Sequence, residues 1–265
     1  MNTVFRVTIV NDILQKKLFL QMSTKKYIVF LMILLLVAAG MYSFSVIRYD
    51  DENIISYKVN IKKQNIRFYW KDENNEPIKS LGNLKNFLAK NKQELLFAMN
   101  AGMYQTKNAP LGLFIQENKT ITALNKRSGN GNFYLKSNGI FYISMDNEAT
   151  ICKTEDFFDN GKIKYATQSG PMLVIDGKIH TAFTPGSTNL NIRNGVGILP
   201  NNEVVFAISK AGISFFDFAT YFKNLGCKNA LYLDGFVSRT YLPEKNWVQV
   251  DGDFAVMIGV SRNAP

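Results

Sequence analysis

The chain has 265 residues, of which 46% are hydrophobic and 20% charged, and its formal net charge is +10. These fractions are those of a globular protein. The first 26 residues supply +4 of the charge, and the other basic residues are scattered, often beside Asn or Asp. Without a dense Lys/Arg stripe, this distribution argues against nucleic-acid binding and favours an anionic small substrate or polymer, or simply solvated lysines.

An uncharged apolar run lies near the N-terminus. Tyr27 to Ile47 follows Lys25 and Lys26 directly. About 20 apolar residues cross a hydrocarbon core as a helix, and the lysines before them place the N-terminus in the cytoplasm. We therefore predict a basic cytoplasmic segment (1–26), a transmembrane anchor (27–47) and an exported domain (48–265).

A cleaved signal peptide is the alternative for the same run. Small residues between Ala38 and Ser45 offer a cleavage site. Cleavage would make the domain secreted, whereas an anchor would hold it on the periplasmic or extracellular side of the inner or cytoplasmic membrane. Both alternatives place the domain outside the cytoplasm.

The exported part offers few groups for metal binding or nucleophilic catalysis. It contains two cysteines, Cys152 and Cys227, and one histidine, His180. In an oxidising compartment the cysteines form one disulfide or stay two buried thiols, and the sequence leaves both open. No cysteine pair has zinc spacing, and His180 follows an Asp176-Gly177 turn typical of a hairpin. We expect neither a metal nor a cofactor.

Beyond the apolar run the sequence changes to short alternating segments. Ser56 to Ile61 and Asn65 to Trp70 are predicted to pair as two strands. Apolar residues at helical spacing predict a helix over Leu81 to Glu94, and Leu95 to Met99 is an apolar strand. Asn132 to Ser144 is predicted to be a hairpin, because Ser137-Asn138-Gly139 is a strong turn signal.

The strongest helix pattern lies at Ser214 to Leu225. Ser214 and Asp217 form a capping box with Asp in place of Glu, and Gly226 follows the last turn. Few helices separate the alternating strands, which argues against a doubly wound sheet. We predict a single α+β domain of short, mostly antiparallel strands in curved sheets, with two main packing helices on the outside.

Two apolar strands end at a polar side chain followed by a glycine turn. Asp234 ends the strand in LYLDGFVSRTY and precedes Gly235 and Ser238. Asn100 ends another strand and enters a turn that contains Gly102. This construction mounts a reactive group on a rigid base. Taken alone, the Asn100 side chain is equally explained as one that stabilises its own turn, and Asp234 is better explained as the cap of a hairpin turn.

Two further polar clusters lie between these. Gln168, Ser169 and Gly170 stand before Pro171, and Arg193 stands among Gly-bearing turns. The planar guanidinium of arginine bonds two oxygens of an anion at once, so Arg193 is a candidate anion clamp. An unpartnered surface arginine is the alternative.

Four stretches together resemble one family, in order and at similar spacing: FAMNAGMY (97–104), QSGPMLV (168–174), NIRNGVG (191–197) and GCKNALYLDGFVSR (226–239). They resemble the phosphodiester glycosidase family, which includes a lysosomal enzyme that removes N-acetylglucosamine from a mannose-6-phosphate diester. The likeness covers about residues 95 to 258. It implies a hydrolase of sugar-phosphodiester bonds. The sequence departs at Phe236, where many relatives have a second glycine.

The resemblance implies roles for particular residues. Asp234 is expected as base or nucleophile, Arg193 as phosphate clamp and Ser238 as a further catalytic group. The expected substrate-binding set is Asn100, Gly102, Gln168, Ser169, Gly170 and Gly235. A phosphodiester leaving group is a weak base, so one carboxylate suffices if cations and donors hold the departing phosphate. From the sequence itself, the candidates for a second carboxylate are Asp176, Asp251 and Asp253, but each lies in an Asp-Gly or Gly-Asp turn, which favours a turn-stabilising role.

Two functions follow from these residues. The first is hydrolysis of glycosyl-1-phosphate bonds in a surface glycan or glycopolymer, with a carbohydrate or sugar-phosphate substrate, membrane contact through the N-terminal segment and no nucleic-acid partner. The second is a non-catalytic module that binds an anionic cell-surface glycan. The Asp, Arg, Asn and Ser set favours hydrolysis, and the bulk of Phe236 beside the acid favours binding alone.

Overall fold

The computed structural model describes residues 26–35, 52–234 and 237–264. The chain divides into two units, Met1–Asp50 and Asp51–Pro265. In the first, residues 26–35 form an exposed helix. No helix in the described ranges is long and apolar enough to cross a membrane, and residues 36–47 of the predicted anchor lie outside those ranges. The anchor, the signal peptide and the domain limits stay predictions.

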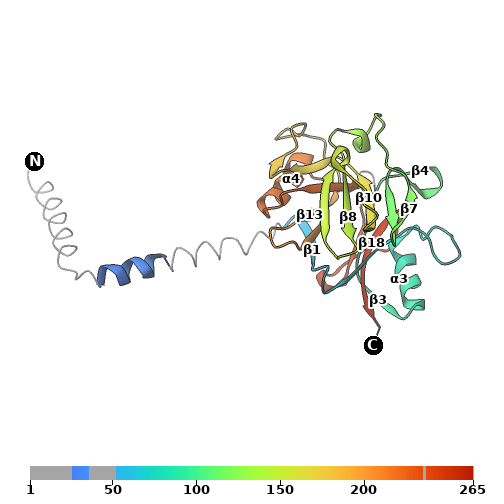
Figure 1. Ribbon diagram of the computed structural model, residues 1–265, viewed down its shortest axis with the longest axis horizontal. Coiled ribbons are helices and arrows are strands. Elements are labelled where there is room, and N and C mark those ends of the chain that lie inside the picture. The colour runs from blue at the N-terminus through green and yellow to red at the C-terminus, as the bar shows by residue number, and fades with distance from the viewer. Residues whose placement is uncertain (1–25, 36–51, 235–236, 265) are drawn as a thin grey trace, which may run out of the picture. The chain divides into compact units, whose positions relative to one another are not determined.

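The second unit contains three main sheets (Figure 1), in which every pairing between described strands is antiparallel. The first, in spatial order, is β1 (Ile54–Val59), β14 (Val204–Ser209), β13 (Asn194–Ile198), β15 (Ala230–Asp234), β11 (Met172–Ile175) and β12 (Lys178–Ile179). The second is β7 (Lys119–Thr122), β6 (Phe114–Gln116), β10 (Ile163–Ser169), β8 (Gly139–Ser144) and β9 (Ala149–Lys153). The third is β17 (Trp247–Val248), β16 (Thr240–Leu242), β3 (Gln93–Asn100), β18 (Met257–Asn263) and β2 (Asn65–Tyr69).

Shorter elements complete the unit. A two-stranded ribbon pairs β4 (Tyr104–Gln105) with β5 (Ala109–Pro110). The 3₁₀ turns are η1 (Thr106–Asn108), η2 (Asn132–Tyr134), η3 (Thr154–Asp156) and η4 (Pro243–Lys245). The α-helices of this unit are α3 (Leu81–Lys90) and α4 (Phe215–Asn224). The predicted α+β class with antiparallel strands and two packing helices is confirmed.

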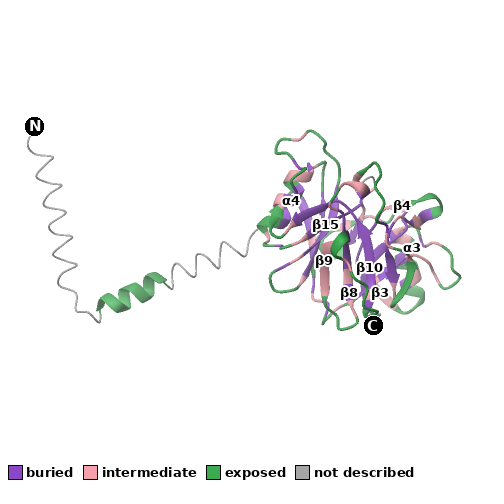
Figure 2. Cartoon of the chain, turned by 45° about the horizontal axis from the view of Figure 1, so that its top comes forward, coloured by how far each residue is buried: buried purple, intermediate pink, exposed green. Residues whose placement is uncertain are grey.

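One apolar core is shared by all three sheets, and the strands around it are buried (Figure 2). Along β14, Val204, Phe206 and Ile208 face this core, while Val205 and Ala207 join the cluster beneath α4. A strand covered on both faces has a continuous apolar sequence instead of an alternating one. The same holds for β15, which delivers Asp234, so the candidate acid stands on a rigid, fully buried strand.

Helix α4 is determined by its own sequence. The Ser214 hydroxyl donates to Asp217 Oδ2 at 2.7 Å and accepts from the Asp217 N–H at 3.1 Å. The predicted N-cap is present, but the Asp217 carboxylate accepts from the Ser214 hydroxyl rather than from the backbone N–H that a capping box uses. Gly226 adopts the predicted left-handed φ of +81°. A Cβ on Gly197 would lie 2.7 Å from the ring of Phe222, so the glycine lets the helix approach β13 closely.

Two predictions of local pairing are wrong. The strands predicted at 56–61 and 65–70 do not pair with each other: β1 pairs with β14 and β2 with β18. The predicted hairpin at 132–144 is instead the turn η2 followed by β8, which pairs with β9 and β10. In both cases burial against distant strands outweighs a local turn signal. The helix predicted over 81–94 ends at Lys90, because β3 already begins at Gln93.

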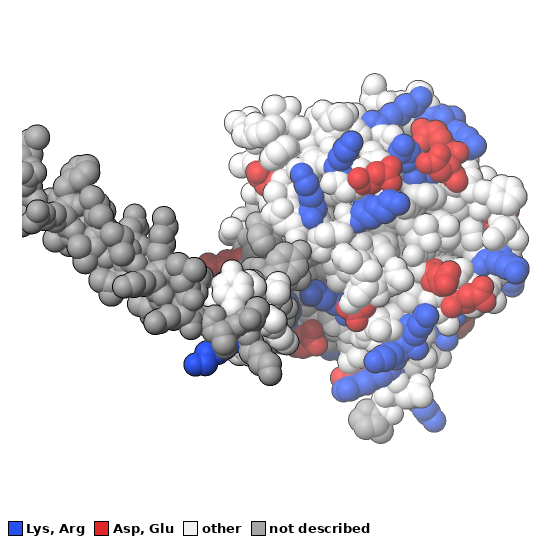
Figure 3. All heavy atoms as spheres, turned by 60° about the vertical axis from the view of Figure 1, so that its left-hand side comes forward, with Lys and Arg blue, Asp and Glu red and all other residues white. Residues whose placement is uncertain are grey.

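Charged side chains are dispersed on the face of the second unit shown in Figure 3. Lys and Arg side chains alternate there with Asp and Glu. On that face the positive charge is thus divided among separate positions, as the scattered basic residues of the sequence predict.

Candidate active site

Three strand ends from two sheets meet at Asp234. It ends β15, Asn100 ends β3, and Asn194 begins β13 directly opposite Asp234 in the β13–β15 register. The Asn100 side-chain Nδ2 donates to Asp234 Oδ2 at 2.5 Å. Asn100 is 0% exposed and Asp234 6% exposed. The structure therefore brings together the two strand-end residues that the sequence singled out, although they lie far apart along the chain.

The side-chain amide of Asn100 has a fixed orientation. Its Oδ1 accepts from the backbone N–H of Arg239 at 2.9 Å and from Asn194 Nδ2 at 2.9 Å. Asn194 Nδ2 also lies 2.8 Å from the backbone oxygen of Asn100. Because donors occupy Oδ1, the NH₂ end must face the carboxylate. Asn194 was not among the predicted site residues.

A cavity of about 360 Å³ has Asp234 in its wall. The other described lining residues are aromatic, amide-bearing or apolar: Met103, Tyr104, Leu111, Asn130, Gly131, Asn132, Phe133, Tyr134 and Val237. None of these described residues is Lys or Arg. Aromatic faces beside neutral hydrogen-bonding groups suit a ring that carries hydroxyls.

Part of the cavity wall comes from a segment, residues 130–134, to which the sequence assigned no site role. A Cβ on Gly129 would lie 2.7 Å from the ring of Tyr134, so this ring packs against the backbone of Gly129. Gly131 has a φ of +90°, a conformation that favours glycine. The glycines of SGNGNF thus shape a cavity wall.

Tyr104 places a phenol in the same cavity. Burial raises the pKa of Tyr104, and the nearby carboxylates of Asp234 and Asp253 raise it further. The phenol therefore stays protonated at neutral pH and can donate a hydrogen bond. Of the three predicted second carboxylates, Asp253 is the one that shares the surroundings of Tyr104 with Asp234; it accepts from Asn108 Nδ2 at 2.9 Å.

The other two second carboxylates lie in ordinary ion pairs. Asp176 stands in the β11–β12 turn, 3.9 Å from Lys228, and both side chains are exposed. Asp251 contacts Arg239 Nε at 2.9 Å.

Arg193 is buried behind the strands, with 1% of it exposed. Its Nε donates to the backbone oxygen of Ile213 at 2.8 Å, and Nη2 donates to that of Asn189 at 3.0 Å. Nη1 lies 3.4 Å from the Tyr232 hydroxyl, and the guanidinium carbon stacks 3.6 Å from the Phe215 ring centre. Burial lowers the pKa of Arg193. All three guanidinium nitrogens thus contact protein groups.

The predicted hydroxyl and amide donors also have protein partners. Gln168 Oε1 accepts from the backbone N–H groups of Leu113 and Asn125, both at 2.9 Å. Ser169 Oγ donates to the backbone oxygen of Leu233 at 2.8 Å. Ser238 Oγ donates to the backbone oxygen of Ile192 at 3.3 Å. The two serines hold the segments on either side of Asp234.

The predicted glycines are explained by packing where the structure describes them. A Cβ on Gly102 would lie 2.8 Å from Thr167 Oγ1, and one on Gly170 would lie 2.5 Å from the Cβ of Asn138. Gly235 and Phe236 lie outside the described residues.

His180 and the two cysteines lie apart from this site. His180 Nε2 lies 2.9 Å from the Lys136 oxygen and 2.9 Å from the Ser137 nitrogen, and burial lowers the His180 pKa. Cys152 and Cys227 are not bonded to each other. Burial raises the thiol pKa to about 11 for Cys152 and about 12 for Cys227. Within the described ranges no group of three or more His, Cys, Asp or Glu could hold a metal.

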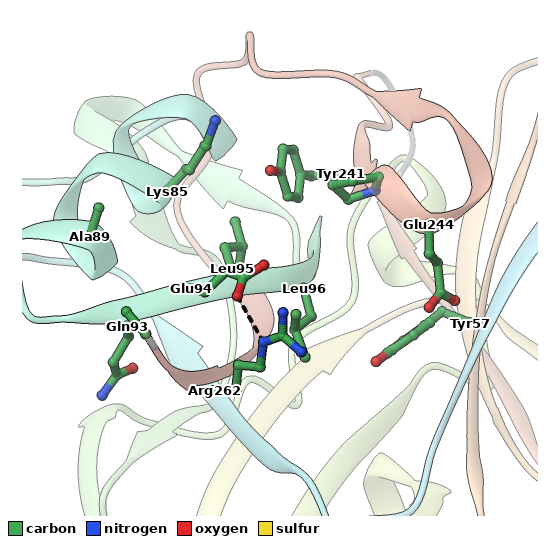
Figure 4. Close-up of a pocket in the computed structure, with 12 residues that line it drawn as sticks. Tyr57, Lys85, Ala89, Gln93, Glu94, Leu95, Leu96, Tyr241, Glu244 and Arg262 are labelled. Carbon is green, nitrogen blue, oxygen red and sulfur yellow. Dashed lines mark hydrogen bonds and ion pairs between the residues drawn. The ribbon is translucent and has the colours of Figure 1, made fainter.

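A larger cavity, about 790 Å³, lies at the other end of β3 (Figure 4). Lys85, Glu94, Tyr241 and Arg262 line it, and Arg262 Nε contacts Glu94 Oε2 at 2.7 Å. None of the predicted site residues lies in its wall. The smaller cavity at Asp234 is therefore the better candidate, since it joins a buried carboxylate to a formed recess.

Comparisons with known proteins agree with the sequence resemblance. The sequence model of the phosphodiester glycosidase family matches residues 93–260. The uncharacterised protein YigE of Escherichia coli (strain K12) is 36% identical over 210 residues, which are 78% of this chain and 81% of YigE.

Two solved structures are similar at lower identity. The catalytic domain of zebrafish N-acetylglucosamine-1-phosphodiester alpha-N-acetylglucosaminidase, auto-inhibited by its pro-peptide, has 16% identity and a TM-score of 0.47, with coverage of 80% of this chain and 85% of that one. A hypothetical protein from Synechocystis has 14% identity and a TM-score of 0.47; the match covers 78% of this chain and 59% of that chain.

Proposed function

Because the chain belongs to the phosphodiester glycosidase family, we propose that it is a hydrolase that cleaves sugar-phosphodiester bonds in a surface glycan or glycopolymer. The observation that carries this proposal is the buried Asp234 carboxylate in the wall of an aromatic and amide-lined cavity, held by Asn100 at 2.5 Å. In this proposal the sugar ring occupies the cavity, and the phosphodiester lies at its mouth.

As a nucleophile, the Asp234 carboxylate would form a bond to the anomeric carbon, and water would then hydrolyse the resulting glycosyl ester. As a base, it would take a proton from water, whose oxygen bonds to the same carbon directly. The bond between that carbon and the phosphate oxygen breaks, and the phosphate leaves as an anion of low basicity, so it needs little protonation. Protonated Tyr104 is a hydrogen-bond donor in the wall of the same cavity. Asp253 is the candidate for a second carboxylate, because its charge, like that of Asp234, raises the pKa of Tyr104.

The role of Arg193 as phosphate clamp stays a prediction. A phosphate that reached its guanidinium would have to displace Asn189 or Tyr232. Asn189 lies in an exposed segment, so its contact is the one that a ligand would replace with least disruption. If Arg193 clamps phosphate, Arg193→Lys should impair cleavage of a sugar-1-phosphodiester more than cleavage of a neutral glycoside. Equal losses would contradict the clamp.

The decisive experiment is hydrolysis of a panel of sugar-1-phosphodiesters by the wild type and Asp234→Asn. The amide oxygen of the variant can still accept from Asn100, so the variant should fold while turnover falls by about 10³-fold or more. Glu94→Gln, in the distant cavity, serves as the matched control and should leave turnover unchanged. Near-normal turnover by Asp234→Asn would refute the assignment.

The binding-module alternative rests on Phe236, which stands two residues after the acid where a glycine is expected. Calorimetry with the same panel separates the two functions. A binding module would bind a panel member without turnover by the wild type, and Asp234→Asn would bind it as well as the wild type. Export through residues 27–47, as anchor or signal peptide, completes the proposal and places the substrate outside the cytoplasm.

A further inference from the structure

We propose that Asn194 is a positioning residue for the candidate acid: it holds the Asn100 amide in the orientation that donates to Asp234. The inference rests on the proposed function for its catalytic meaning, since Asp234 is the reacting carboxylate there. Its geometry is independent of which sugar is cleaved. Asn194 is not among the described residues that line the cavity, and it acts through Asn100.

The two ends of an asparagine amide have almost the same shape but opposite hydrogen-bonding character. If the Asn100 amide turned over, its oxygen would face the Asp234 carboxylate, and its NH₂ would face the N–H of Arg239 and the NH₂ of Asn194. Both changes are repulsive. Two donors at Oδ1 select the donating orientation more strongly than the Arg239 N–H alone would.

The side-chain amide of Asn194 is oriented by hydrogen bonds at its NH₂ end, and its oxygen makes none with the described residues. Its Nδ2 lies between two acceptors, the backbone oxygen and Oδ1 of Asn100, at 2.8 and 2.9 Å. Its Oδ1 is consequently turned away and has no hydrogen-bond partner among the described residues, although Asn194 is 0% exposed. A buried acceptor without a partner is destabilising and uncommon in native proteins. The molecule accepts this loss where it fixes the donor to the acid.

Several charged and titratable groups surround the carboxylate and contribute to its titration. Tyr104 faces it from the β4 ribbon, and Tyr232 precedes it on β15; the pKa of each is raised partly by Asp234. Arg193, directly before β13, bonds Tyr232, and Arg239 contributes the N–H at Asn100. Asp253 acts on Tyr104. The variants below leave all five of these groups in place.

The test is the ¹³C NMR titration of the Asp234 carboxyl in the full chain, assigned by its loss in Asp234→Asn. A donor to the carboxylate favours its ionised form, so removing the donor moves the midpoint to higher pH. We expect a rise of about one pH unit for Asn100→Ala, and of about half that for Asn194→Ala, which leaves Asn100 with one orienting donor. Asn194→Val, suited to a strand, should give the same rise if the alanine variant is too unstable.

Asn229→Ala is the control. Asn229 Nδ2 also donates to a backbone oxygen, that of Ile151 at 2.9 Å. Asn229 lies just before β15 begins, at the other end of the strand from Asp234, so removing its side chain should leave the midpoint unchanged. An unmoved midpoint in both Asn194 variants would overturn the proposal. So would a fall, because Asn194 Oδ1 would then be accepting from the protonated carboxyl. The titration needs no substrate, so it stands even if Asp234→Asn retains turnover and the proposed function fails.

Discussion

Asn100→Asp would place a second carboxylate against the candidate acid. One of its oxygens would keep the donors at Arg239 N and Asn194 Nδ2, and the other would take the position of Nδ2, 2.5 Å from Asp234 Oδ2. Two ionised carboxylates cannot share that spacing. One proton between them can, because 2.5 Å is the separation of a charge-assisted O–H···O⁻ bond.

The size of the effect follows from this distance. Two unit charges 2.5 Å apart repel by about 7 kcal/mol at an effective dielectric constant of 20. Proton sharing limits the net loss to the roughly 3–5 kcal/mol typical of an uncompensated buried charge. The shared proton raises the folded-state pKa above the unfolded value of about 3.9. Stability is therefore fully present below that value and is lost as pH rises through the folded pKa.

Urea unfolding between pH 5 and pH 8 tests this reasoning. Asn100→Asp should lose about 3 kcal/mol more than the wild type over that interval. The double variant N100D/D234N again pairs one amide with one carboxylate, but now the residue at 234 donates and the residue at 100 accepts. It should lose this pH dependence. If Asn100→Asp loses the same stability at every pH, or the double variant is equally sensitive to pH, the two side chains do not face each other as described.

Three further predictions concern residues outside the cavity. Burial lowers the His180 pKa, so wild-type stability should fall as pH drops below 6.5 toward the folded value, and His180→Gln should flatten this fall in thermal unfolding. Ser214→Ala should reduce the free energy of unfolding by about 1 kcal/mol through loss of the α4 cap, whereas Ser214→Thr should retain most of it; a loss shared by both would contradict the capping role. With pKa values raised to about 12 and about 11, Cys227 and Cys152 should alkylate at pH 8 at least about 10-fold more slowly than the unfolded chain, as followed by mass spectrometry.

Features determined within a few residues could be predicted from the sequence. The N-cap at Ser214, the buried face of α4 and the left-handed Gly226 depend on neighbours along the chain. Strand partners do not. The link after β1 looks like a hairpin, but the buried faces of β1 and β2 find their partners in β14 and β18, which come much later in the sequence.

The residues of the site could likewise be predicted only where the signal was local. Asp234 and Asn100 could be found because each ends an apolar strand before a glycine turn. Asn194 carried a weaker form of this signal, an Asn that opens a strand, but Arg193 beside it has the more conspicuous chemistry. The wall at 129–134 had no local signal. Its place in the cavity with Asp234 depends on contacts of Phe133 with Gly112 and Asn138, which lie outside the segment.

Because β16 covers only a short part of one edge of β3, the rest of that edge is open to pairing with a strand of another molecule. On β3, β16 pairs only with Ala98 and Met99, so no described strand covers the same edge of β3 from Gln93 to Phe97. An uncovered edge is a template for a strand of another molecule. Here residues of that edge line the larger cavity together with the charged side chains of Lys85, Glu94 and Arg262, so a strand of a second copy would have to dock beside these charges. These charges oppose fibre-like self-association through β3.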